Sequence, residues 1–335
     1  MWPRLPVHFS LVVALGCPAL LAASPAEAKS YKGAEVYSRQ TVLYGRMEMR
    51  MRMIRGSGLL STFFTYKDGS EKPDAFWEEI DLEVFGKDDA KSWQSNIISG
   101  NPKSTSEEVH PMDASLADDY HTYTVEWTPD YVAWSVDGVL ARKTEGDQSA
   151  DLTTAESLRF NVWSSESEAW VGEFDESALP AYQFVNWIKY YRYENGEFVL
   201  DWTDDFDKFD TSRWAKGNWT FDTNRVDFVP ANAIAQDGAL VLAITREGET
   251  GFKGTVPTDS QGGAGVGAPS RDAGTTPEDA GTAPKDTGTQ PNDTTKDNSS
   301  SGGCTYAPHG SGGLGLLLSA LALVGLARRR RAKQA

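Results

Sequence analysis

"WEEIDLEVFG", residues 77–86, alternates side chains of two kinds with a period of two. That period predicts a β-strand, because successive side chains of a strand point to opposite faces. One face suits a hydrophobic core: it holds Ile80, Leu82 and Val84, with Glu78 at its start. The other face holds three carboxylates between two aromatic rings: Trp77, Glu79, Asp81, Glu83 and Phe85.

Two interpretations of the acidic face remain open at this point. The first is an ordinary solvated strand, although the face has no Lys or Arg to offset the repulsion. The second is a hydrolytic site for sugars, because glycoside hydrolysis needs one ionised carboxylate and one protonated carboxylic acid. A neighbouring negative charge keeps the acid protonated, and a third carboxylate lets the set titrate as a unit. Residues four apart on a flat strand have Cα atoms about 13 Å apart, so the second interpretation requires a concave sheet.

The sequence around this strand is also strand-like. In "YGRMEMRMRM" (44–53) four methionines alternate with charged residues. "YHTYTVEWTPDYVAWSVDGVLARK" (120–143) contains turn signals at "TPD" and "DG", and further strands are predicted in 158–165, 183–193 and 239–247. No convincing helical period occurs between about 31 and 250. We therefore predict an all-β fold, a sandwich of two curved antiparallel sheets with a concave substrate cleft.

The motif and its flanks resemble glycoside hydrolase family 16, in the lichenase branch. "EIDLE" matches the family's E-x-D-x-E signature, and the similarity continues through "YGRMEMRMRMIRGSGLLSTFFTYKDG", "LRFNVWSSESEAWVG" and "YQFVNWIKYYRY". Resemblance implies a β-jelly-roll and a retaining endo-glucanase that cuts β-1,4 bonds in mixed-linkage β-1,3-1,4-glucan. It assigns Glu79 as nucleophile, Glu83 as general acid and base, and Asp81 as modulator, with no chemical part for Glu78.

The order of the segments suggests a circular permutation. The segment 205–246, which begins "DFDKF", comes first in most lichenases and last here. Jelly-roll termini lie close together at the surface, so joining them and opening the chain elsewhere preserves the strand contacts. The new junction would be "YENGEF", residues 193–198.

The same resemblance implies a set of sugar-binding residues and a structural calcium ion. The binding set is Phe64, Tyr66, Glu71, Trp77, Gln94, Asn96, Arg159, Asn161, Trp163, Trp170, Trp219, Asp222 and Arg225. For each aromatic residue, simple core packing is the alternative. The calcium positions are Asp205, Asn186 and Gly238, mainly through backbone oxygens. Asp68 departs from the family pattern, which has Asn there.

Two other functions stay open beside the lichenase. One is a different β-glucan specificity, such as a β-1,3-glucanase or transglycosylase; laminarin-type members usually have one more residue in the motif, E-x-D-x-x-E. The other is a non-catalytic carbohydrate-binding module displayed on a surface, which would have no need for three repelling acids.

Composition excludes several other classes. The formal charge of −16 is unsuited to a phosphate backbone, so we expect no nucleic-acid partner. The four His and two Cys form no zinc set, and no P-loop or G-x-S-x-G elbow occurs. We expect a monomer.

The two ends of the chain predict export. Residues 1–28 have the charge, apolar run and "AEA" end of a signal peptide cut ahead of Lys29, and we favour that cut over lipidation at Cys17. The folded domain is predicted over 29–252 and a Gly/Pro-rich linker over 253–303. Residues 304–335 join Cys304, a short apolar run and "RRRR", which resembles a myxosortase-type sorting tail; a plain membrane anchor is the alternative. Either tail would keep an exported domain at the cell surface.

Overall fold

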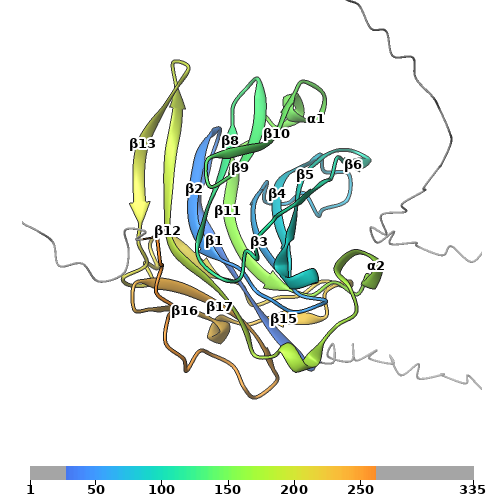
Figure 1. The fold of residues 1–335 in the computed structure, drawn as a ribbon. Coiled ribbons are helices and arrows are strands. Elements are labelled where there is room, and N and C mark those ends of the chain that lie inside the picture. Colours follow the sequence, from blue (N-terminus) through green and yellow to red (C-terminus); the bar gives the residue numbers. More distant parts are fainter. Residues whose placement is uncertain (1–27, 262–335) are drawn as a thin grey trace, which may run out of the picture.

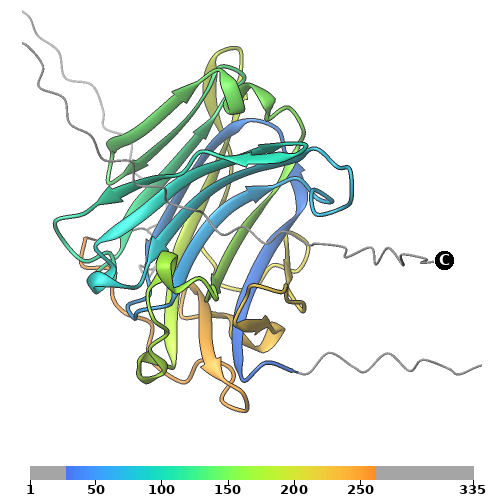
Figure 2. The same cartoon turned by 90° about the vertical axis from the view of Figure 1, so that its right-hand side faces the viewer.

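The computed structural model describes residues 28–261 of the chain. The predicted signal peptide through residue 27, the linker from residue 262 and the sorting tail with Cys304 lie outside the described residues, and so does Cys17. The described part is built from strands, arranged in two curled layers that give the shape of a half-barrel (Figures 1 and 2). This confirms the predicted all-β, jelly-roll type of fold.

One layer contains the acidic strand, β4. Its strands pair antiparallel in the order β1–β11–β3–β4–β5, with β6 and β7 both on β5. Their bounds are β1 Tyr31–Val42, β3 Leu60–Tyr66, β4 Trp77–Phe85, β5 Ser92–Gly100, β6 Lys103–Thr105, β7 Glu108–Pro111 and β11 Glu156–Trp163.

The second layer pairs in the order β10–β9–β8–β2–β12, and the far side of β12 takes both β13 and β17. Strand β16 completes this edge beside β17. The bounds are β2 Gly45–Arg52, β8 His121–Trp127, β9 Tyr131–Val136, β10 Val139–Glu145, β12 Ala181–Glu194, β13 Glu197–Asp204, β16 Ala233–Gln236 and β17 Ala239–Arg246.

Strand β1 connects the layers. Its first residues pair with β17, and its middle pairs with β14 (Trp214–Lys216). It also pairs with β15 (Val226–Phe228), and this short pairing is parallel. This short contact is a local exception in sheets that are otherwise antiparallel, as predicted, because β15 approaches the start of β1 from a loop rather than from a hairpin.

The hydrophobic core lies between the layers. The second layer contributes the alternating methionines predicted from "RMEMRMRM": Met47, Met49, Met51 and Met53, all buried. Across from them, β4 contributes Ile80, Leu82 and Val84, which are also fully buried. Burial of apolar side chains from both layers holds the sandwich together without a disulfide in the described residues.

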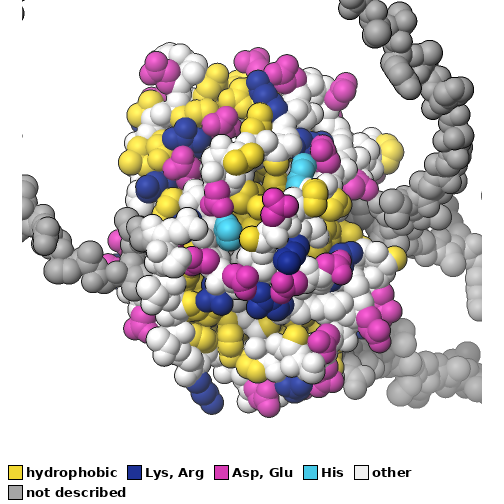
Figure 3. Space-filling view, in the orientation of Figure 1, with side chains coloured by type: hydrophobic (Ala, Val, Ile, Leu, Met, Phe, Trp, Pro, Cys, Tyr) yellow, Lys and Arg dark blue, Asp and Glu magenta, His cyan; other side chains and the backbone are white. Residues whose placement is uncertain are grey.

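Helical segments are short. They are α1 (Asp147–Asp151), α2 (Glu168–Val171) and three 3₁₀ turns at Asp88–Ala90, Glu176–Ala178 and Pro230–Asn232. Over residues 28–261, none has the length and apolar character needed to cross a membrane. Acidic and basic side chains are interspersed on the face shown in Figure 3.

Residues 253–261 pack on the domain, although the sequence analysis assigned them to the linker. Val256 is buried beside Phe184, and Asp259 is buried against Arg50 with N–O distances of 2.6 and 2.8 Å. The folded part therefore continues past the predicted boundary at residue 252. Composition alone missed this segment because its contacts are with β2 and β12, far away in the sequence.

Candidate active site

The three carboxylates of β4 point away from the core, yet Asp81 and Glu83 are shielded from water and Glu79 is half-buried. Ile80 and Leu82 on the opposite face are in the core, as the alternation predicts. Asp81 is nevertheless only 4% exposed and Glu83 only 7% exposed. A solvated strand would leave these side chains open, so their burial argues against that interpretation of the acidic face.

The register of the neighbouring strands explains the shielding. Strand β3 places Tyr66 opposite Glu79 and Phe64 opposite Asp81. Strand β5 places Asn96 opposite Asp81 and Gln94 opposite Glu83. Directly opposed residues of paired strands share a face, so aromatic rings stand on one side of the carboxylates and amides on the other.

Each carboxylate accepts a hydrogen bond from a different side chain. Trp77 Nε1 donates to Glu79 Oε2 at 2.6 Å. Asn96 Nδ2 donates to Asp81 Oδ2 at 3.1 Å, and Gln94 Nε2 donates to Glu83 Oε2 at 3.0 Å. These donors orient the three carboxyl groups and satisfy part of their hydrogen-bonding capacity.

Electrostatics separate the roles of the three groups. Burial and the charge of Glu79 together raise the pKa of Glu83 to about 8, against the hydrogen bond from Gln94, which lowers it. Burial and the charges of Glu79 and Glu83 hold the pKa of Asp81 well above its usual range. A protonated Asp81 can donate to Glu79, and this bond opposes the effect of burial on the Glu79 pKa. At neutral pH the arrangement favours a neutral Glu83 and concentrates negative charge on Glu79.

Lys103 is a member of the site that the sequence analysis missed. Its Nζ lies 3.7 Å from the centre of the Trp77 ring. Burial raises the pKa of Glu79, and the charge of Lys103 opposes that rise. Burial and the nearby carboxylates act in opposite directions on the Lys103 pKa, which is lowered. Lys103 belongs to β6, whose pairing with β5 brings it to this position. The turn signal Gly100-Asn101-Pro102 could have indicated this hairpin, but not that Lys103 would lie over the Trp77 ring.

Arg159 organises the other side of the aromatic wall. Its guanidinium lies 4.6 Å from the centre of the Tyr66 ring. Its Nη1 donates to Glu35 at 3.1 Å and its Nη2 to Asp68 at 2.6 Å. Asp68, which stands where the family pattern has Asn, thus supplies a carboxylate partner for Arg159. Tyr66 is held in turn by its hydroxyl, which donates to Glu71 Oε2 at 2.8 Å.

Glu35 is a second residue that the sequence analysis missed. It is 1% exposed, and β1–β11 pairing places it opposite Asn161. Burial raises the pKa of Glu35 to about 7, against the charge of Arg159 and hydrogen bonding from Asn161. Its alternation with Tyr37 on β1 could have placed Glu35 on a strand face, but not next to β11.

Aromatic rings form a continuous series from the end of β4. Phe85 lies 6.1 Å from Trp170, and Trp170 lies 5.7 Å from Trp163. Trp163 lies 5.4 Å from Phe221, which is 5.8 Å from Trp219. Trp219 is 43% exposed, so at least this ring offers apolar surface to a ligand. Trp170 also connects to the carboxylates, because its Nε1 donates to Gln94 Oε1 at 3.3 Å.

Two residues of the predicted sugar-binding set, Arg225 and Asp222, lie apart from the carboxylates. Arg225 bonds to Glu168 of α2 at 3.2 Å and lies 5.7 Å from the Phe174 ring. Asp222 is exposed in the loop that follows Trp219. The structure therefore joins these two residues to the rim formed by α2 and the 217–225 loop.

Glu78 lies on the face of β4 opposite the three carboxylates, where no chemical part was expected for it. It is buried and accepts hydrogen bonds from Thr153 N, Thr154 N, Thr154 Oγ1 and Lys67 Nζ. Burial alone would raise its pKa, but the bonds from Thr154 and Lys67 lower it below the usual value. Glu78 is thus fully engaged in holding the loop after α1 against β4.

The three positions predicted for calcium lie on neighbouring strands. Asn186 is in β12 between Val185, which pairs with Leu240, and Ile188, which pairs with Asp204. Asp205 follows Asp204, and Gly238 precedes β17. Asn186 Oδ1 is buried without a hydrogen-bond partner, so it fits an oxygen ligand. Residues 28–261 contain no cluster of three His, Cys, Asp or Glu suited to a metal, so most ligands would be carbonyl oxygens.

A protonated carboxyl group and a charge-stabilised carboxylate on one aromatic-flanked face define the site of a glycoside hydrolase. Comparisons with known proteins give the family. Residues 21–189 match the family described as "Glycosyl hydrolases family 16". A β-glucanase of Fibrobacter succinogenes is 50% identical over 264 residues, which are 76% of this chain and 75% of that protein. The chain belongs to glycosyl hydrolases family 16.

More distant relatives match shorter parts. A β-glucanase of Bacillus subtilis is 33% identical over 180 residues, 53% of this chain and 71% of that protein. A β-glucanase of Acetivibrio thermocellus is 33% identical over 165 residues, which are 46% of that protein. Among solved structures, a Bacillus licheniformis β-glucanase shows 30% identity and a TM-score of 0.42, over 47% of this chain and 70% of that one.

Proposed function

We propose that the protein is a retaining endo-glucanase that hydrolyses β-1,4 bonds in mixed-linkage β-1,3-1,4-glucans. The observation that carries the proposal is the pair of β4 carboxyl groups with opposed surroundings. Glu79 is bonded by Trp77 and lies near Lys103, which favour its charge, whereas burial beside Glu79 keeps Glu83 protonated.

In the first step, Glu79 attacks the anomeric carbon as the glycosidic C–O bond breaks. Glu83 gives its proton to the departing oxygen, and a glycosyl ester forms on Glu79. In the second step, Glu83, now ionised, takes a proton from water as that water attacks the anomeric carbon. The ester bond breaks, Glu79 leaves as a carboxylate, and the β-configuration is retained. Asp81 supports Glu79 through their hydrogen bond in the free enzyme.

Mixed-linkage glucan is supported by two features. The 50%- and 33%-identical relatives are β-glucanases. The motif Glu79-x-Asp81-x-Glu83 also lacks the extra residue of laminarin-type members. A reducing-sugar assay on barley β-glucan, lichenan and laminarin separates the specificities: we expect rapid release from the first two. Rapid cleavage of laminarin with no cleavage of lichenan would contradict mixed-linkage glucan as the substrate. Retention of the protein on glucan without release of products would favour a non-catalytic binding module.

A pair of adjacent variants tests the site itself. Glu79→Gln removes the nucleophile, so we expect hydrolysis of barley β-glucan to be lost with the fold intact by circular dichroism. Glu78→Gln is the matched control, because its side chain is one position away and points to the other face. Glu78→Gln should keep hydrolysis even if its thermal midpoint falls. Full activity of Glu79→Gln would contradict the assignment.

We also propose the circular permutation. The family match ends at residue 189, yet the following segment supplies β14, which pairs with β1, and β17, which pairs with β12. A chain reopened at the Asn195–Gly196 turn, with residue 261 joined to residue 29 by a flexible Gly/Ser linker so that the packed segment 253–261 is kept, should retain activity. If that variant fails to fold, the two orders of segments do not give the same fold, and the proposed permutation would be contradicted.

Export and surface attachment are likewise proposals. Lys29 N donates to Asp227 Oδ2 at 2.9 Å, so a cut ahead of Lys29 would leave an ammonium group paired with that carboxylate. Mass spectrometry of the protein from its native cells should give an N-terminus at Lys29 and a fragment ending near Cys304. A full-length chain in the cytoplasm would contradict export.

For calcium, we propose a stabilising rather than a catalytic ion, held by Asn186 and carbonyl oxygens near Asp205 and Gly238. Calcium should raise the thermal midpoint of the purified protein relative to EDTA, because a ligand bound to the folded state stabilises it. The shift should disappear in Asn186→Ala. Equal midpoints with calcium and with EDTA in the unmodified protein would contradict the site.

A further inference from the structure

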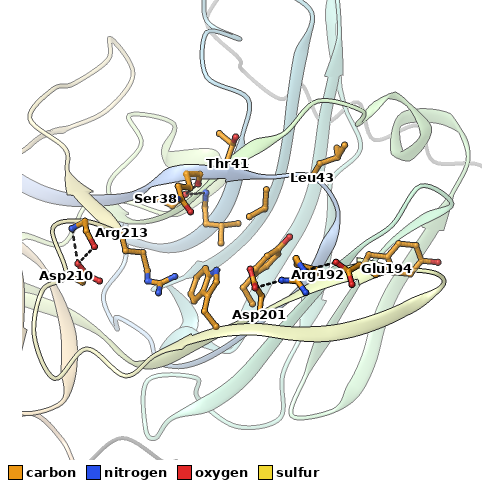
Figure 4. A pocket seen from close by; sticks show the side chains of 15 residues that line it. Ser38, Thr41, Leu43, Arg192, Glu194, Asp201, Asp210 and Arg213 are labelled. Carbon is orange, nitrogen blue, oxygen red and sulfur yellow. Dashed lines mark hydrogen bonds and ion pairs between the residues drawn. The ribbon is translucent and has the colours of Figure 1, made fainter.

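A cavity of about 460 Å³ lies away from the β4 carboxylates. It opens between the second half of β1 and the β12–β13 hairpin, with the 210–213 loop at one end (Figure 4). None of the carboxylates or of the sugar-binding residues predicted from the sequence lines it. Ser38 and Leu158 line it, whereas their neighbours Tyr37 and Arg159 point to the other face of the same sheet. The cavity and the hydrolytic site are therefore on opposite faces.

The charged side chains around the cavity are already paired. Arg192 bonds to Glu194 at 2.9 Å and to Asp201 at 2.5 Å along the hairpin. Arg213 lies 3.4 Å from Asp204, a residue next to the cavity. Asp210 accepts bonds from the backbone and hydroxyl of Ser212. Two arginines and three carboxylates line the cavity, and each already has a polar partner, so the cavity offers little attraction to an anionic ligand and suits a neutral polar one.

The same wall has an aromatic surface and spare hydrogen-bonding groups. Trp202 is half-buried and fixed by Tyr190, at 5.6 Å between rings, and by the Arg213 guanidinium at 4.0 Å. Within residues 28–261, the Trp202 indole N–H, the Tyr193 hydroxyl and the Gln40 amide have no hydrogen-bond partner. Aromatic rings beside unpaired donors suit a sugar, which has apolar ring faces and hydroxyl edges.

We propose that this cavity is a second binding site for an unbranched β-linked glucose chain, separate from the site of hydrolysis. The lining extends from Asp210 along the hairpin to Glu194, which suits an elongated ligand (Figure 4). The volume falls within the usual range of ligand sites. A chain held there would keep the enzyme on polymer while the opposite face cuts. This inference rests on the proposed function, because it takes the substrate polymer as its ligand.

Binding stoichiometry tests the proposal. In the Glu79→Gln background, isothermal titration with a mixed-linkage tetrasaccharide should show two sites per chain. Adding Gln40→Ala and Tyr193→Ala should leave one site, since these side chains supply donors and ring surface in the cavity. Leu200→Ala is the control, because Leu200 is 51% exposed on the same hairpin but does not line the cavity. One site in every variant would overturn the proposal.

A second measurement uses the active enzyme. Gln40→Ala/Tyr193→Ala should bind barley β-glucan at least tenfold more weakly in affinity electrophoresis, with unchanged kcat/KM on a short aryl oligosaccharide. Unchanged retention on the polymer would overturn the second site while leaving hydrolysis intact. A parent enzyme that hydrolyses no β-glucan would instead show that the proposed function is wrong, so the two failures are distinguishable.

Discussion

Gln94 and Lys103 act on opposite ends of the acidic strand, and each adjusts a different carboxyl group. Gln94 donates to Glu83 and favours its charged form. Lys103 lies over Trp77 and favours the charge of Glu79. Since the proposed mechanism needs a protonated Glu83 and an ionised Glu79, these two neighbours should set the two limbs of the pH profile.

Gln94→Leu should move the alkaline limb of kcat/KM to higher pH. Removing the amide removes a bond that stabilises ionised Glu83, so the Glu83 pKa should rise above its value of about 8. The acid then stays protonated to higher pH. The readout is the midpoint of the limb, which is independent of any loss of sugar contacts in the rate itself. A midpoint that moves to lower pH would contradict the role of Glu83 as the acid.

Lys103→Met should move the acid limb to higher pH. Without the ammonium charge, ionised Glu79 loses a favourable interaction and its pKa should rise. Activity would then be lost at a higher pH as the solution is acidified. Lys143→Met on β10 is the control, because Lys143 pairs with Glu145 at 2.7 Å rather than with the site. An unchanged acid limb in Lys103→Met would contradict the contact between Lys103 and Glu79.

At the scale of elements, strand faces were predictable from the sequence and strand partners were not. The alternation in β2 and β4 correctly assigned Met47 and Leu82 to the core, because burial follows the period of the strand. Lys103 reaches the Trp77 ring because β5, which carries β6 in a short hairpin, pairs with β4, and no local pattern specifies that β4–β5 pairing. The E-x-D-x-E spacing indicated three acids on one face, but not the burial that separates their protonation.

The segment 253–261 also shows that contacts between distant parts of the chain could not be predicted from local sequence. Arg50 belongs to the charged face of β2, which alternation alone would leave in water. It is instead 5% exposed, because Asp259 covers it from a distant part of the chain. Proline and glycine near residue 253 indicated a linker, and only the folded chain reveals this contact.

Arg50→Met should therefore destabilise the domain by about 3–5 kcal/mol, because it leaves the buried Asp259 carboxylate without its partner. Denaturant unfolding followed by tryptophan fluorescence would measure the loss. Arg50→Met/Asp259→Leu should recover part of it, since both charges are then absent. Arg55→Met, at a pair whose side chains are 48% exposed, should cost about 1 kcal/mol or less. If Arg50→Met and Arg55→Met lower the free energy of unfolding equally, the buried pair of Arg50 with Asp259 does not stabilise the domain as expected.

At the scale of the whole molecule, the two faces of the β1–β11 sheet have different surroundings. One face holds the β4 carboxylates within a wall of aromatic and amide side chains, and the other packs on the second layer and opens at the β12–β13 hairpin. Figure 2 shows that the layers are curled rather than flat. The proposed hydrolysis and the proposed retention of polymer would therefore use separate surfaces.

The anomeric configuration of the first product tests the central claim most directly. Proton NMR during the first minutes of barley β-glucan hydrolysis distinguishes new β-anomers from α-anomers before mutarotation mixes them. Attack by Glu79 followed by attack of water inverts the centre twice, so the account predicts new reducing ends in the β-configuration. New reducing ends in the α-configuration would show direct attack by water, and would contradict Glu79 as the nucleophile.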